Sequence, residues 1–153
     1  MVPARARSDM LQLPRLQGLR TSEPRAMDEG DMCRLLVLYE SVPGTGAAAA
    51  AGAVASGAEA AGATVGMTSL GDTVLADVAW ADAVALGIGA RVSGLPWEVR
   101  RWLDALGFSG WRGVLKGKPA CVFATGGPSD NREADAACRL TASILDARGM
   151  DAV

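Results

Sequence analysis

The stretch LYESVPGTGAAAAAGAVASG, residues 38–57, joins an apolar run to a short loop of Ser, Pro, Gly and Thr and then to a block of small residues. The run that leads into it, CRLLVLYE (33–40), is almost continuously apolar, as is typical of a strand buried on both faces of a sheet. The alanine block predicts a helix from Ala47 that ends at Gly62. A buried strand, a Gly-rich loop and a helix in this order predict the start of a parallel α/β domain.

The same alternation continues along the rest of the chain. Further strands are predicted at ATVGMTSL (63–70), DAVALG (82–87), PACVFAT (119–125) and MDAV (150–153). Helices are predicted at 74–80, at 96–107 and at 131–148, and the segment GFSGWRGVLKGK (107–118) is predicted to be an irregular connection. Alternating strands and helices favour a parallel sheet with right-handed crossovers.

Length and composition indicate one domain with a core, since the chain has 153 residues of which 50% are hydrophobic. Residues 1–31 mix Pro, Arg and acidic residues without a sustained period, and we expect a disordered N-terminal extension ahead of a domain at 32–153. A transit peptide, or a true start at Met27 or Met32, remains open as an alternative for this extension. The net charge of -2 gives no basic field for nucleic acid, and no run reaches the roughly 18 apolar residues of a membrane span.

The chemistry available to the side chains is restricted by two features of the composition. The chain has no histidine, which removes the commonest general base and metal ligand. Its three cysteines, Cys33, Cys121 and Cys138, are far apart and have apolar neighbours, so reduced and buried thiols are expected rather than a disulfide or a metal cluster. We therefore expect a cytoplasmic protein without a metal site, whose chemistry comes from a cofactor, from carboxylates or not at all.

Three Gly-rich loops follow predicted strands, and each contains Ser or Thr. They are the first loop, ESVPGTG (40–46), the second loop, GIGARVSG (87–94), and the third loop, ATGGPSDN (124–131). In an open parallel sheet, ligands bind at the carboxyl ends of the strands where the strand order reverses. Three such loops with small donors and free backbone amides predict one anionic ligand there.

The first loop suits a phosphate monoester better than the alternatives. Gly44, Gly46 and Ala49 match the dinucleotide pattern G-x-G-x-x-A, but the loop does not start directly after the strand and the second strand lacks a terminal acid. No Gly-Lys-Ser/Thr follows, so a Walker loop is excluded. The candidate phosphate ligands are therefore Ser41, Gly44, Thr45 and Gly46.

Three segments of the chain also resemble a known family. The strand-end tyrosine Tyr39 is followed by Ser41 and Gly44. The block ALGIGARVSGLPWEVRRWLDALG (85–107) matches at Gly87, Arg91, Arg100, Leu103 and Asp104, with Trp102 in an aromatic position, and LKGKPACVFAT (115–125) matches at Gly117, Lys118 and Phe123. With these residues the sequence resembles the flavodoxin-like proteins, in particular NAD(P)H:quinone oxidoreductases of the tryptophan-repressor-binding-protein type, over about 34–153.

The resemblance implies a doubly wound sheet of order 2-1-3-4-5 that binds flavin mononucleotide (FMN), with NAD(P)H as co-substrate and a quinone or similar small acceptor. It implies the phosphate on the first loop. The flavin ring is implied to lie between two sets of residues: Ala90, Arg91, Val92 and Ser93, and Thr125, Gly126 and Gly127. Trp111 is a further candidate to lie beside the ring. No residue is predicted to be a catalytic acid or base.

The sequence also departs from the family pattern. Ile88, Gly89 and Ala90 replace a Thr-Pro-Thr run, so two hydroxyls are missing from the flavin loop. The chain ends within the fifth strand and lacks the closing helix, so we expect a C-terminally incomplete fold with one sheet face partly uncovered. A partner subunit such as a homo-oligomer, an incomplete gene model or low stability could each follow. Three functions compete: a flavin-dependent quinone reductase, a flavodoxin-like electron carrier, and a cofactor-free degenerate or regulatory domain.

Overall fold

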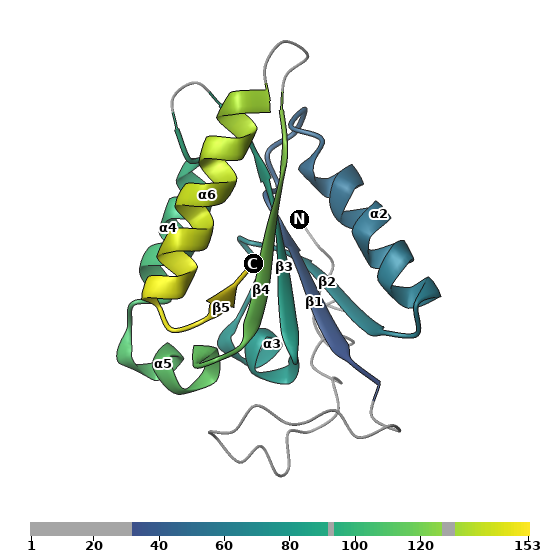
Figure 1. Cartoon of the computed structure of the whole chain (residues 1–153), viewed down its shortest axis with the longest axis vertical. Coiled ribbons are helices and arrows are strands. Elements are labelled where there is room, and N and C mark those ends of the chain that lie inside the picture. Colours follow the sequence, from purple (N-terminus) through teal and green to yellow (C-terminus); the bar gives the residue numbers. More distant parts are fainter. Residues whose placement is uncertain (1–31, 92–93, 127–130) are drawn as a thin grey trace.

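A five-stranded parallel sheet forms the centre of the molecule (Figure 1). The computed structural model describes residues 32–91, 94–126 and 131–153. The strand order is β2-β1-β3-β4-β5, as expected for a doubly wound flavodoxin-like sheet. The strands are β1 (Arg34–Tyr39), β2 (Thr64–Ser69), β3 (Ala83–Gly89), β4 (Pro119–Thr125) and β5 (Asp151–Ala152).

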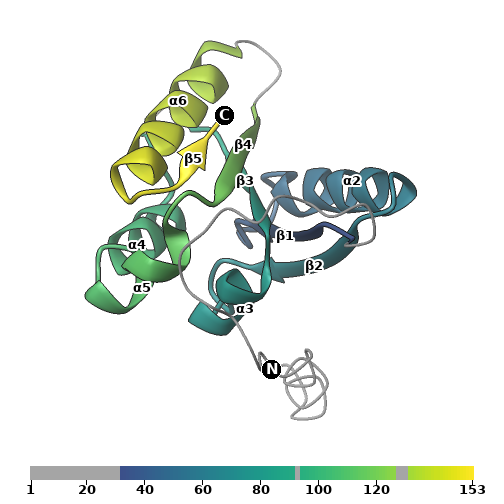
Figure 2. The ribbon, with the colours of Figure 1, turned by 60° about the horizontal axis from the view of Figure 1, so that its bottom comes forward.

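Helices cover the two faces of the sheet unequally (Figure 2). Of the described helices only α2 lies on one face, where it contacts β1, β2, β3 and β4, while the helices on the other face share one large core cluster. The helices are α2 (Ala47–Ala60), α3 (Leu75–Trp80), α4 (Trp97–Ala105), α5 (Ser109–Leu115) and α6 (Asn131–Ala147). None of these helices, within the described residues, is long and apolar enough to cross a membrane.

The alternation of side chains along the strands divides the core between the two faces. Leu36 and Leu38 of β1 pack into the large cluster, whereas Val37 packs on the opposite face against Ala51 and Ala55 of α2. The small side chains of α2 allow the helix to lie close to the strands. This close packing fixes the position of the helix N-terminus above the carboxyl ends of β1 and β3.

The segment predicted to be an irregular connection contains α5, so that prediction was wrong for 109–115. The helix has only seven residues, two of them glycine, and its N-terminus has no side-chain cap. Local propensity therefore did not reveal it. Tertiary packing stabilises the helix, because Leu115 is fully buried and Trp111 packs against the large cluster.

The predicted burial of the cysteines was also wrong. Cys121 is exposed, and Cys33 and Cys138 are only partly buried. On β4, Ala120 and Val122 face the large cluster, so the alternating position of Cys121 lies on the sheet face that α2 covers only in part. Among the described residues the cysteines form no disulfide, and no group of side chains has the composition of a metal site. The expectations for 1–31 lie outside the described residues.

Candidate functional site

The carboxyl ends of β1, β3 and β4 lie side by side, and the first described residues of the three Gly-rich loops follow these strand ends (Figure 1). Tyr39 at the end of β1 pairs with Ser69 on one side and with Gly87 on the other. Gly89 at the end of β3 pairs with Thr125 at the end of β4. The strand order reverses between β1 and β3, so this edge is where ligands bind in open parallel sheets.

The first loop presents main-chain donors at the start of α2. Gly44 and Gly46 have left-handed backbone angles, with φ of 82° and 74°, and Gly46 is the N-cap of the helix. Among the described residues, none accepts a hydrogen bond from the main-chain N–H groups of Gly44, Thr45 or Gly46. Free amides at the N-terminus of a 14-residue helix suit a bound anion.

The hydroxyl of Thr45 forms hydrogen bonds to the main chain of the first loop and of α2. Its Oγ1 donates to the carbonyl of Val42 at 3.0 Å and accepts from the N–H of Ala47 at 3.3 Å. It therefore holds the turn that precedes α2. The main chain of this loop, rather than the Thr45 side chain, is the free donor.

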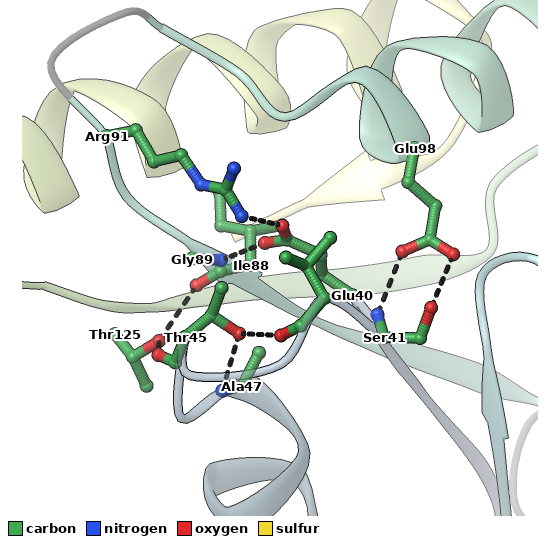
Figure 3. A network of polar contacts seen from close by, with 10 residues as sticks. Glu40, Ser41, Thr45, Ala47, Ile88, Gly89, Arg91, Glu98 and Thr125 are labelled. Carbon is green, nitrogen blue, oxygen red and sulfur yellow. Dashed lines mark hydrogen bonds and ion pairs between the residues drawn. The ribbon is translucent and has the colours of Figure 1, made fainter.

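Ser41 is engaged by Glu98, a residue that the sequence analysis did not single out (Figure 3). The N–H of Ser41 donates to Glu98 Oε2 and its Oγ donates to Glu98 Oε1, both at 2.8 Å. Glu98 lies in the first turn of α4 and is 7% exposed. A sequence signal existed, because Leu95, Glu98 and Trp102 follow helical spacing and place this acid on the buried face.

A second buried acid, Glu40, lies where β1 ends. Its side chain has no exposed surface, accepts the N–H of Gly89 at 2.7 Å and pairs with the guanidinium of Arg91 at 2.7 Å. The alternation of Leu36, Leu38 and Glu40 placed this residue on the buried face of the strand, which was the available signal. Glu40 thus attaches the second loop to the end of β1.

The third loop is attached to the first by Thr125. Its Oγ1 donates to the carbonyl of Thr45 at 2.5 Å, and its own carbonyl accepts the N–H of Ala90 at 2.8 Å. A Cβ at Gly46 would lie 3.8 Å from Thr125, which shows how closely these loops approach. Direct polar contacts therefore connect all three loops (Figure 3).

Most of the predicted site residues lie at this one edge. The residues there are Ser41, Gly44, Thr45, Gly46, Ala90, Arg91, Thr125 and Gly126. Val92, Ser93 and Gly127 lie outside the described residues. Trp111, a candidate neighbour of the ring, lies on α5, which leads into the amino end of β4, whereas the three loops follow the carboxyl ends of their strands.

The donors and charges at the edge allow a test of whether a flavin phosphate fits. The main-chain amides at 44–46 fit an anion, and the exposed Gly126 keeps a main-chain N–H that donates to no described residue. Against this, the hydroxyls of Ser41, Thr45 and Thr125 all donate within the protein. The fit of a phosphate group therefore rests on the backbone of the first loop.

Neither a scan of protein-family models nor a search of curated proteins finds a match to the sequence, whereas solved structures match along most of the chain. One is the two-electron reduced flavodoxin of Megasphaera elsdenii, with a TM-score of 0.59, 26% identity, and coverage of 77% of this chain and 80% of that one. Another is a WrbA-like flavodoxin from Agrobacterium tumefaciens, with a TM-score of 0.63, 24% identity, and coverage of 77% and 74%. A third is FerB, an NAD(P)H:(acceptor) oxidoreductase from Paracoccus denitrificans, with a TM-score of 0.61, 17% identity, and coverage of 80% and 75%. The chain has a flavodoxin-like fold, and flavin-dependent redox proteins share it.

Proposed function

We propose that this chain is a flavin-binding redox protein that holds the phosphate of FMN on the main-chain N–H groups of Gly44, Thr45 and Gly46. The observation that carries the proposal is the set of free amides at the start of α2, at the point where the strand order reverses. The flavin-binding structures that share the fold support it.

The ring is proposed to lie between the second and third loops, against Ala90, Arg91, Thr125 and Gly126. When bound, FMN would supply the two-electron redox chemistry. The chain contributes binding and charge. Glu40 holds one end of the Arg91 guanidinium while the side chain stays 40% exposed, so further N–H donors of the guanidinium remain near the proposed ring position. The N–H of Gly126 is a second fixed donor at the same place.

The finer reaction that we propose is the transfer of two electrons from NAD(P)H to a quinone or similar acceptor. It is supported by the likeness to FerB, whose name describes an NAD(P)H:(acceptor) oxidoreductase, and to the WrbA-like flavodoxin. A homo-oligomer is part of this proposal, because α2 covers its sheet face only in part. A cytoplasmic location is also proposed, supported by cysteines that form no disulfide among the described residues.

One alternative is favoured by a specific observation. The hydroxyls of Ser41, Thr45 and Thr125 all donate within the protein, as expected of a domain that keeps the fold without the cofactor. An electron carrier without a nicotinamide site is a further alternative. Flavin content separates the cofactor-free domain from the other two, and the rate of reduction by NADPH separates the reductase from the carrier.

The test is a titration of the purified full chain with FMN, followed by flavin fluorescence, in two matched glycine variants. Gly44→Ala and Gly62→Ala both place alanine at a left-handed position, with φ of 82° and 92° and no atom within 4 Å of the new Cβ. Each therefore loses about 1 kcal/mol of folding stability. Only Gly44 lies in the first loop, so Gly44→Ala is expected to weaken FMN binding by about tenfold and Gly62→Ala to leave it unchanged. A folded wild-type chain that retains no FMN would overturn the proposal.

A further inference from the structure

Ser41 has no donor left for a ligand while Glu98 is in place. A serine offers one main-chain N–H and one hydroxyl hydrogen, and both are directed to the Glu98 carboxylate at 2.8 Å. Ser41 is also the first hydroxyl-bearing residue after β1, and it lies in the loop whose main-chain amides are proposed to bind the phosphate. A phosphate that used Ser41 would have to displace this carboxylate or share its position.

The charge of Glu98 is not offset by an ion pair with any residue that the structure describes. Glu40 is paired with Arg91, whereas Glu98 contacts no cationic side chain among the described residues, although it is 7% exposed. The two acids and the single arginine of this cluster therefore sum to one negative charge. Ser41, Gly44 and Gly46 are exposed, so an anion that approaches the first loop meets this negative charge through solvent, and salt screens the repulsion.

From these contacts we infer that Glu98 is a specificity-determining residue that disfavours phosphorylated flavin relative to flavin without a phosphate. The inference rests on the proposed function, since it assigns ligand choice within the same site. Riboflavin carries the same ring and ribityl chain as FMN but lacks the phosphate, so it is the ligand that the Glu98 charge does not repel. Glu98 acts here through charge and through its hold on Ser41, not through contact with the ring.

The first test compares FMN and riboflavin titrations of wild type and Glu98→Gln. Glutamine has nearly the same shape, removes the charge and accepts only one of the two Ser41 donors. FMN binding is expected to tighten by at least about tenfold, with riboflavin binding unchanged. Asp104→Asn removes an exposed carboxylate from the same helix and is expected to change neither ligand. Adding Ser41→Ala to Glu98→Gln should reduce the gain for FMN and leave riboflavin unaffected.

The second test uses wild type alone and does not depend on the folding of a variant. If Glu98 repels the phosphate, raising the salt from about 0.02 M to about 0.5 M strengthens FMN binding relative to riboflavin, because the repulsion is screened. The inference is overturned if Glu98→Gln changes the affinities for FMN and riboflavin equally. It is also overturned if salt weakens FMN binding to wild type relative to riboflavin binding. Either result leaves the proposed function standing. Failure of wild type and Glu98→Gln to bind either flavin overturns both.

Discussion

The carboxylate of Glu40 and the guanidinium of Arg91 lie 2.7 Å apart, and the glutamate side chain has no exposed surface while the arginine side chain is 40% exposed. Glu40 also accepts the N–H of Gly89, so its two oxygens bind two donors from the second loop. The end of β1 and the second loop are thus held by a buried charge whose partner reaches solvent. Removing Arg91 alone is expected to destabilise this junction more than removing both charges, because Glu40 would then remain buried and unpaired.

The first prediction concerns this ion pair. Arg91→Met is expected to lower the free energy of unfolding by about 2 kcal/mol, less than for a fully buried pair because water reaches the arginine. Glu40→Gln added to Arg91→Met should recover most of the loss, since the amide oxygen still accepts the N–H of Gly89. Urea denaturation measures both changes. The control is Arg101→Met, an exposed arginine without an ion pair to a described residue; an equal loss in both single variants would contradict the prediction.

A second prediction concerns the contact between β3 and β4. A Cβ at Gly87 would lie 2.6 Å from ring atoms of Phe123, so the ring must move to admit an alanine. Gly87→Ala is expected to cost about 1–3 kcal/mol of folding stability. In a Phe123→Leu background the same substitution should cost clearly less, and the two values come from thermal or urea unfolding. Equal costs in both backgrounds would show that the ring does not set the requirement for glycine.

A third prediction has the opposite sign and uses a glycine inside α2. Gly57 is exposed, its backbone is helical, and a Cβ there would meet no atom within 4 Å. Gly57→Ala is therefore expected to stabilise the protein by about 0.5–1 kcal/mol, because alanine restricts the unfolded chain and favours the helix. The urea midpoint should rise without a change in the slope of the transition. A lower midpoint would mean that α2 packs more closely around Gly57 than the structure shows.

The fourth prediction concerns Lys118, whose Nζ donates to the carbonyls of Val78 and Ala81 at the end of α3. Burial lowers the pKa of this ammonium group to about 8, from 10.5 for an unperturbed lysine, although the nearby Asp82 acts in the opposite direction. Between these pH values the unfolded chain binds more protons than the folded one, so this lysine makes stability rise with pH.

The measurement for this prediction is a set of urea denaturation curves from pH 7 to about 10, for wild type and Lys118→Met. Subtracting the variant removes the contributions of Cys121 and Cys138, whose thiol pKa values are raised by burial. The wild-type free energy of unfolding should gain relative to the variant as the pH rises through about 8. A difference that stays flat with pH would show that the two carbonyls keep the ammonium charged.

Much of the fold could be predicted from the sequence, because the periods of the apolar residues are strong in most elements. CRLLVLYE marked β1 within one or two residues, and PACVFAT coincides with β4. Residues Val99, Trp102 and Leu103 were placed on the buried face of α4 by their spacing, and all three are buried. The strand order came from the family resemblance, since alternation alone does not fix the order of parallel strands.

The site was less predictable, because its contacts depend on which residues meet across the sheet. The loops were located from glycine and hydroxyl content, but Glu40 and Glu98 were passed over although both follow the buried periodicity of their elements. An acid on an apolar face is a clear departure from the pattern. Its partners, however, come from distant segments, and no local pattern indicates that Glu98 lies beside Ser41.

The contacts at this edge of the sheet join residues far apart in the chain, with separations of 57 residues for Ser41 and Glu98 and 80 for Thr45 and Thr125. During synthesis, the first loop therefore leaves the ribosome long before its partners exist. Closing such long segments costs entropy that only the packed sheet offsets. A nascent chain would thus bind a ligand at this edge only after β4 has paired with β3. Ligand binding during synthesis would therefore indicate that the sheet has assembled.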